Sequence, residues 1–156
     1  MKLPSILTLD KTRRINLGFT LIEILLALSI IAALSVVGLI AGLDSYQRYL
    51  FRSDLEKAVS LLQKARSAAM NNIGEKSHGV YFQDPAAFVL FRGTSYAARN
   101  SSFDLLVEKS KTVAASGLAE AVFTRLSGTT TGGNITLSDG IRNINITINN
   151  EGGINW

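Results

Sequence analysis

Hydrophobic residues are concentrated in one long run near the N-terminus. After Phe19 this run is interrupted only by Glu23, and residues 24–43 contain no charged side chain. Twenty residues form about 30 Å of α-helix, which matches the hydrocarbon core of a bilayer. The run is longer than the hydrophobic region of a usual signal peptide, and no A-x-A-like cleavage site follows it. The pattern therefore predicts a membrane-spanning helix over residues 19–43.

The helical pattern continues beyond the apolar run as an amphipathic segment. Between Asp44 and Asn72 the chain contains neither proline nor glycine. Apolar residues recur there at steps of three or four: Phe51, Leu55, Ala58, Leu62, Ala65 and Ala69. This spacing places them on one face of a helix. We therefore expect one helix from Phe19 to Asn72, with Gly74 as its C-terminal cap and residues 44–74 as its amphipathic half.

The remainder of the chain, residues 75–156, shows the pattern of short strands. The strand candidates are runs rich in aromatic and branched residues: 80–82, 88–91, 103–107 and 122–126. Asp84-Pro85 lies between the first two runs and predicts a hairpin there. The predicted fold class is α+β, with a long N-terminal helix packed on a C-terminal antiparallel β-sheet head.

A second hairpin is predicted near the C-terminus. Asp139-Gly140 is a favoured two-residue turn, and isoleucines alternate with polar residues from Asn143 to Asn149. The alternation puts the isoleucines on one buried face of the sheet. A two-residue turn at Asp139-Gly140 would pair Ile135 with Ile144.

Charge is unevenly distributed along the chain. The net charge is +4, and the first 18 residues carry four basic side chains against one acidic side chain, so only about +1 remains for the rest. The basic residues before the apolar run, among them Lys11, Arg13 and Arg14, place the N-terminus in the cytoplasm and the C-terminal part outside. The small charge of the rest is weak support for binding to nucleic acid.

Several classes of chemistry find no support in the sequence. The chain has no cysteine, which excludes disulfides and thiolate ligands, and His78 is its only histidine. A site with several histidine ligands is therefore impossible, and no nucleophile elbow, P-loop or dinucleotide motif occurs. We expect no enzymatic activity, no catalytic residue, no metal and no cofactor. His78 is expected to be solvated or bonded locally.

The residues Gly18-Phe19-Thr20-Leu21-Ile22-Glu23 carry the most specific motif. With the basic segment before them and the apolar run after them, they resemble the N-terminus of type IV pilins and type II secretion pseudopilins. Gly18 has no side chain, so a protease can approach the backbone closely at this position. The resemblance implies that prepilin peptidase removes residues 1–18 by cutting between Gly18 and Phe19, and that the new amino group of Phe19 is methylated.

Glu23 is unusual because a carboxylate in an apolar helix costs free energy in a membrane. The resemblance implies that Glu23 pairs with the amino group of an adjacent subunit and so sets the filament register. Alternatively, Glu23 only complements the dipole at the helix N-terminus. Gly38 and Gly42 have G-x-x-x-G spacing, which allows close helix packing. They can equally be weak points in the helix or ordinary glycines in a membrane helix.

The segment Leu62–Ala69 follows the pattern L-x-x-A-R-S-x-A and is similar to the GspH/FimT group of minor pilins and pseudopilins. This implies a minor structural subunit of a type II secretion pseudopilus or a type IV pilus, involved in protein transport across the outer envelope. The implied partners are prepilin peptidase/methyltransferase and other pilin or pseudopilin subunits in a hetero-oligomeric filament. The implied location is the bacterial inner membrane, as a single-pass protein, and then an envelope-spanning or extracellular filament.

Two other functions remain open at this stage. One is a DNA-binding minor pilin of a competence or type IV pilus system, similar to FimT proteins, with Arg142 and Arg125 as the contacts to DNA. For Arg142 the alternative is a strand-edge residue with its head group in water. The other function is a single-pass membrane anchor or sensor head that is never cleaved.

Overall fold

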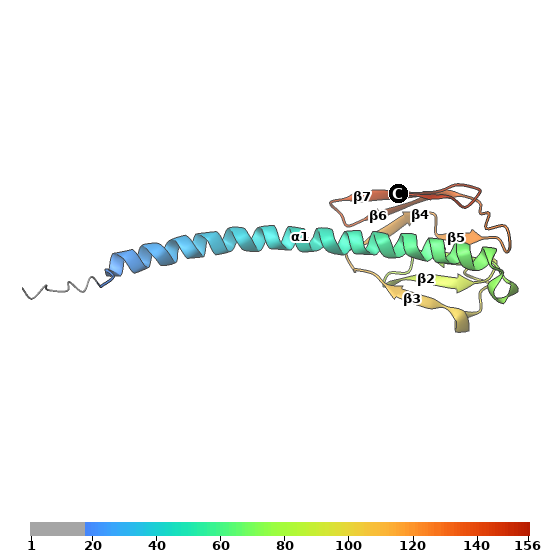
Figure 1. Cartoon of the computed structure of the whole chain (residues 1–156), viewed down its shortest axis with the longest axis horizontal. Helices are drawn as coiled ribbons and strands as arrows, with labels where there is room; N and C mark the ends of the chain where they lie inside the picture. Colours follow the sequence, from blue (N-terminus) through green and yellow to red (C-terminus); the bar gives the residue numbers. More distant parts are fainter. Residues whose placement is uncertain (1–17) are drawn as a thin grey trace, which may run out of the picture. The chain divides into compact units, whose positions relative to one another are not determined.

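The computed structural model describes residues 18–156 and has the α+β fold that the sequence predicts. One long helix, α1 (Leu21–Met70), precedes two antiparallel sheets (Figure 1). The predicted leader up to residue 17 lies outside the described residues. The chain divides into two compact units, of which the first ends at Gly42 and the second comprises Leu43–Trp156.

Both sheets belong to the second unit and contain four strands each. The first sheet has the order β3-β2-β1-β5, with β1 (His78–Tyr81), β2 (Ala87–Arg92), β3 (Leu105–Glu108) and β5 (Glu120–Phe123). The second has the order β4-β6-β7-β8, with β4 (Ala114–Gly117), β6 (Gly133–Ser138), β7 (Asn143–Ile148) and β8 (Ile154–Asn155). Two short 3₁₀ helices complete the elements, η1 (Ile73–Glu75) and η2 (Ser101–Phe103).

A single core joins the amphipathic part of α1 to both sheets. The predicted helical stripe is buried throughout: Phe51, Leu55, Ala58, Leu62, Ala65 and Ala69. It packs against Phe82, Phe88 and Phe123 on the side of the first sheet and against Ile135 and Ile146 in the second. Burial of these apolar side chains is the main favourable term in the stability of the unit. The helical period in the sequence therefore identified the correct face.

The end of α1 differs by two residues from the prediction, and its cap is a different residue. The helix ends at Met70, and Asn72 takes the left-handed conformation with φ 53°. Its N–H donates to the Ala69 carbonyl oxygen at 3.1 Å, a bond typical of a helix C-terminus. Gly74, the predicted cap, is also left-handed but lies in η1. Asparagine can replace glycine here because its short polar side chain tolerates this conformation.

The hairpin around Asp84-Pro85 is confirmed as β1 and β2, but the register of the C-terminal hairpin is not as predicted. Ile135 pairs with Ile146, not with Ile144. The Asp139 carboxylate accepts the N–H groups of Ile141 and Arg142, which lengthens the connection by two residues. A shift of two preserves the face of each side chain, so the isoleucines still point into the core.

Asp54 is a buried acid that the sequence pattern did not single out. It lies on α1 next to the apolar stripe, and its side chain is 2% exposed. One carboxylate oxygen is 2.8 Å from Lys57 Nζ, and the other accepts the N–H of Ser110 at 2.8 Å. Asp54 therefore fastens the loop between β3 and β4 to the helix.

Substituting Asp54 with alanine should destabilise the second unit by about 2 kcal/mol, because a charged hydrogen bond is lost and the Ser110 N–H is left without its acceptor. Urea unfolding of the full chain in detergent, followed by circular dichroism, measures this change. Glu56→Ala is the matched control, since Glu56 forms an exposed pair with Arg52 at 3.5 Å and should cost less than about 0.5 kcal/mol. Equal stability of the two variants would contradict the assigned role of Asp54.

Candidate functional site

The predicted cleavage site lies immediately before the first turn of α1. Gly18, Phe19 and Thr20 are exposed and are not helical. Thr20 Oγ1 accepts the N–H of Glu23 at 3.3 Å, and the Thr20 carbonyl accepts the N–H of Ile24 at 3.2 Å. Thr20 is thus the N-cap of the helix. The Gly18–Phe19 peptide bond is therefore free of helical hydrogen bonds, as a protease substrate must be.

Thr20 was missed in the sequence, although a signal for it was present. Thr20-Leu21-Ile22-Glu23 has the T-x-x-E spacing of a capping box, in which each end residue satisfies a backbone N–H of the other. The structure contains the threonine half of this arrangement. The cap fixes where α1 begins, two residues after the predicted scissile bond.

Glu23 is the acidic residue in the first turn of α1. Its backbone N–H is bonded to Thr20, but among residues 18–156 no cation lies within ion-pair distance of its carboxylate. The position agrees with a favourable interaction with the helix dipole. It also leaves the carboxylate available to a cation from another chain.

After Glu23, the described side chains of α1 in residues 24–39, 42 and 43 are exposed, and most of them are apolar. By length and composition α1 is a candidate to span a membrane, and its large apolar side chains, such as Leu34 and Leu39, are each 66% exposed. The hydroxyl groups of Ser29 and Ser35 donate to backbone carbonyls of the preceding turn, each at 2.7 Å. These bonds satisfy the two hydroxyls without water, as a lipid environment requires.

Gly38 and Gly42 lie four residues apart on α1 and therefore on the same face. A Cβ atom added at either position would meet nothing within 4 Å. Packing within the described chain therefore gives no reason for glycine at these sites. Close approach of a second helix and simple tolerance of glycine both fit this geometry.

Arg142 lies in the hairpin between β6 and β7 and is engaged by two carboxylates. Its Nη2 is 2.6 Å from Asp44 Oδ1, and its Nη1 is 3.1 Å from Asp139 Oδ2. The Arg142 N–H also donates to Asp139, and this bond is the main cause of the lowered pKa of that carboxyl. The Arg142 head group is therefore bonded to carboxylates, whereas the strand-edge alternative placed it in water, and the side chain is 23% exposed.

Arg125 is not brought together with Arg142. Its Nη1 donates to the Glu75 carbonyl oxygen at 3.1 Å, beyond the C-terminal end of α1. Arg142 instead contacts Asp44, which lies 26 residues before Met70, the last residue of α1. The two arginines do not form one basic surface.

His78 lies in β1 and is 6% exposed, so of the two predicted environments, solvated or bonded locally, the solvated one is wrong. Burial lowers the pKa of its imidazole, and the neighbouring Arg92 lowers it further. Both effects favour the neutral form of the His78 imidazole. Within the described part of the chain, no group of three or more His, Cys, Asp or Glu side chains is placed to hold a metal ion.

The L-x-x-A-R-S-x-A segment has a structural explanation. Leu62, Ala65 and Ala69 belong to the buried stripe of α1. Arg66 lies beside it, and its Nη2 donates to the Glu151 carbonyl oxygen at 3.0 Å. A Cβ atom at Gly152 would lie 2.9 Å from Arg66 Nε. The motif thus combines small residues for close packing with an arginine that holds the segment after β7.

Comparison with known proteins supports the N-terminal motif. Residues 13–39 match the family model described as the prokaryotic N-terminal methylation motif. The matched segment contains the Gly18–Phe19 bond, Glu23 and most of the apolar run. No curated protein and no solved structure matches the chain. The chain therefore carries a prepilin-type N-terminal motif of the kind found in type IV pilins and pseudopilins, placed where the structure begins its apolar helix.

Proposed function

We propose that this protein is a minor pilin or pseudopilin that is cleaved between Gly18 and Phe19, methylated at Phe19 and built into a filament through α1. One observation carries the proposal. The methylation-motif match over residues 13–39 coincides with an exposed, non-helical Gly18–Phe19 bond directly before a capped apolar helix. The exposed bond and the start of the capped helix both lie within residues 18–23, inside the segment that matches the motif.

Cleavage would create a new positive charge on Phe19 next to the apolar part of α1. Burying an unpaired ammonium group in a filament core is unfavourable, and so is burying the Glu23 carboxylate. Pairing the amine of one subunit with Glu23 of its neighbour removes both costs together. It also fixes the axial stagger of the helices, because only one offset brings the two charges into contact.

The chemistry of α1 also supports the proposed location. A long uncharged helix preceded by basic residues favours a single pass through the bacterial inner membrane with the N-terminus in the cytoplasm. The Arg66 segment, with its resemblance to the GspH/FimT group, supports a minor subunit of a type II secretion pseudopilus or type IV pilus. Residues 75–156 would then lie outside, where they are accessible to other subunits and to envelope partners.

DNA binding through Arg142 and Arg125 has less support. Arg142 is already paired with two carboxylates, and Arg125 contacts a different part of the head. Contacts to phosphates need several available cations acting together. We therefore do not assign a DNA-binding role to these two arginines.

The N-terminus of the processed chain tests the proposal. Full-length protein co-expressed with a prepilin peptidase should begin at Phe19 and carry one additional methyl group on its amino terminus, as measured by intact-mass and N-terminal peptide spectrometry. A known prepilin processed in the same cells serves as the control. If the control is cleaved and this chain still retains residues 1–18, the protein is an uncleaved membrane anchor and the proposal is wrong.

A further inference from the structure

Two adjoining surface pockets lie near the C-terminal end of α1 and share Arg92 and Phe103. Their volumes are about 280 and 250 Å³. The first is also lined by Lys76, and the second by Lys64 and His78. No described Asp or Glu lines either pocket. Glu75, although it precedes Lys76 in the sequence, is not among the lining residues. We call the two pockets together the Arg92 groove.

Arg92 is held in place without a counter-ion. Its guanidinium carbon lies 4.2 Å from the centroid of the Phe103 ring. On the side of η1, a Cβ atom at Gly74 would lie only 2.5 Å from Arg92 Nη1, so the absence of a side chain at Gly74 makes room for the guanidinium. The aromatic ring and the glycine backbone thus fix the orientation of the planar group before any ligand arrives.

Four other arginines of the second unit pair with carboxylates, and Arg66 and Arg125 donate to backbone carbonyls, whereas Arg92 has neither kind of partner among the described residues. Arg48, Arg99 and Arg142 lie within 2.9, 2.7 and 2.6 Å of a carboxylate oxygen, respectively. The Nε of Arg92 is buried and has no hydrogen-bond acceptor. The buried Nε is closed to a ligand, but the two terminal nitrogens of Arg92 also have no acceptor among the described residues, so they can pair with a bound anion. The chain therefore offers a preformed anion site at Arg92.

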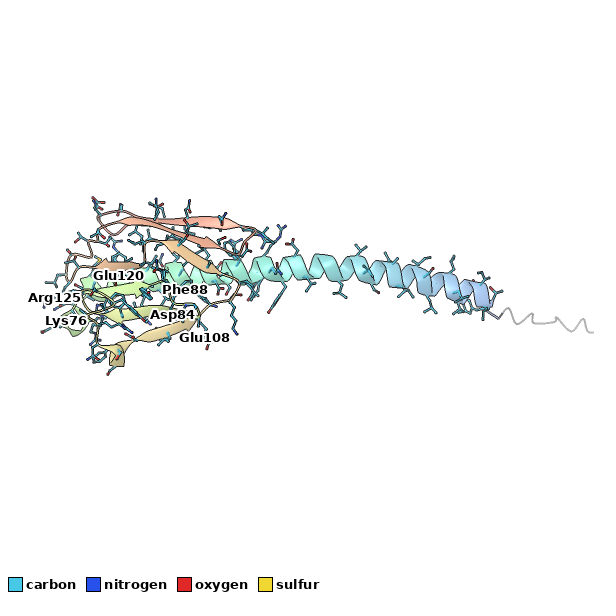
Figure 2. All side chains as sticks on the ribbon, turned by 180° about the vertical axis from the view of Figure 1, so that it is seen from behind. Lys76, Asp84, Phe88, Glu108, Glu120 and Arg125 are labelled. Atoms are coloured by element: carbon cyan, nitrogen blue, oxygen red, sulfur yellow. The ribbon has the colours of Figure 1, made fainter. Side chains whose placement is uncertain are left out.

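The surroundings of Arg92 increase the attraction for an anion. Lys64 and Lys76 are exposed on the rim, and no carboxylate in the described chain pairs with either. Figure 2 shows Lys76 and Arg125 at one end of the head, with Glu120 nearer to them than Asp84 and Glu108. The three cations that line the groove, Lys64, Lys76 and Arg92, raise the local concentration of acidic partners and their rate of association.

The walls of the groove are apolar, which narrows the class of ligand. Ile73 and Leu105 line the pocket that contains His78, and they are 49% and 40% exposed. Leu106 on the same strand is 62% exposed. β3 is also the outer strand of the first sheet, so one of its edges has no strand partner. A cation beside apolar walls and an open strand edge suits a peptide segment better than a free inorganic anion or a phosphate backbone.

We propose that the Arg92 groove binds an acidic segment of another protein. One carboxylate of that segment pairs with Arg92, and a neighbouring apolar side chain packs against Ile73 and Leu105. The charge of the groove and its lack of acidic residues select this occupant. The proposal uses only residues of the second unit, so it stands whether or not the leader is cleaved.

Calorimetric titration of the full chain in detergent with the peptide acetyl-Glu-Leu-Asp-Phe-amide tests this proposal. We expect a Kd of about 1 mM or tighter and at least tenfold weaker binding of acetyl-Gln-Leu-Asn-Phe-amide, in which the carboxylates are replaced. Arg92→Gln should weaken binding of the acidic peptide at least tenfold. Lys111→Gln is the matched control, because Lys111 is an exposed lysine outside both pockets, and it should leave the affinity unchanged.

Other results would overturn the proposal. Equal affinity for the two peptides, or no effect of Arg92→Gln, would show that Arg92 does not select a carboxylate. Inorganic phosphate that binds as tightly as the acidic peptide would indicate a free-anion site. Self-association of the chain that is lost in Arg92→Gln would make a second copy the occupant. If Arg92→Gln fails to fold by circular dichroism, the double variant Lys64→Gln/Lys76→Gln, with both changes at exposed positions, decides the outcome.

Discussion

Replacing Gly18 with valine is expected to reduce removal of the leader at least about tenfold, because a branched side chain prevents close approach of the protease to the Gly18–Phe19 bond. The substitution should not disturb the folded chain. A Cβ atom added at Gly18 meets nothing within 4 Å, and the residue lies before the first turn of α1. Any effect therefore belongs to recognition by the peptidase. The ratio of precursor to processed protein, measured on blots or by intact mass, gives the result.

Gly18→Ala is the graded control for this experiment. Alanine adds a single methyl group and should be processed at a rate between those of glycine and valine. Circular dichroism of both variants should match that of the unmodified chain. Processing of Gly18→Val at the normal rate would refute the role of Gly18 as the last leader residue.

The second large effect is expected at Glu23. Glu23→Val should leave membrane insertion unchanged and reduce incorporation into filaments at least about tenfold, because the amino group of the neighbouring subunit would then be buried without a partner. Valine also suits the apolar run in which Glu23 lies. Membrane fractionation measures insertion, and the amount of protein in sheared or purified filaments measures incorporation.

Two controls separate pairing between chains from capping within one chain. Glu23→Gln keeps the shape of the side chain and removes its charge, so it should resemble the valine variant. Thr20→Ala removes the acceptor of the Glu23 N–H and should cost about 1 kcal/mol of helix stability, but it leaves the carboxylate in place. If Thr20→Ala impairs assembly as much as Glu23→Val, capping explains the effect and the proposed ion pair is wrong.

The large elements were predictable because their apolar residues follow the period of the structure. The stripe from Phe51 to Ala69 identified the buried face of α1, and the alternation from Ile144 to Ile148 identified the buried face of β7. The hairpin register was not predictable from a favoured Asp-Gly pair alone. It depends on the Asp139 side chain, which bonds two N–H groups of the loop and moves the turn.

The candidate sites also differ in how far the sequence alone could predict them. Gly18 and Glu23 could be predicted as site residues because the N-terminal motif is continuous in the sequence and has a fixed spacing. The role proposed for Arg92 could not be predicted from the sequence, because its surroundings come from η1, β2 and η2 and meet only after folding. The burial of His78 was not predicted for the same reason, since it depends on the sheets and not on its neighbours in sequence.

The shared core has a consequence for dissecting this protein. The buried stripe of α1 supplies the surface on which Phe82, Phe88 and Ile135 are packed. A fragment starting at residue 75 would expose these side chains to water and would tend to aggregate. A soluble version for crystallography or antibody production should therefore begin near Leu43, where the second compact unit starts. The amphipathic segment is thus an indispensable scaffold for everything that follows it in the chain.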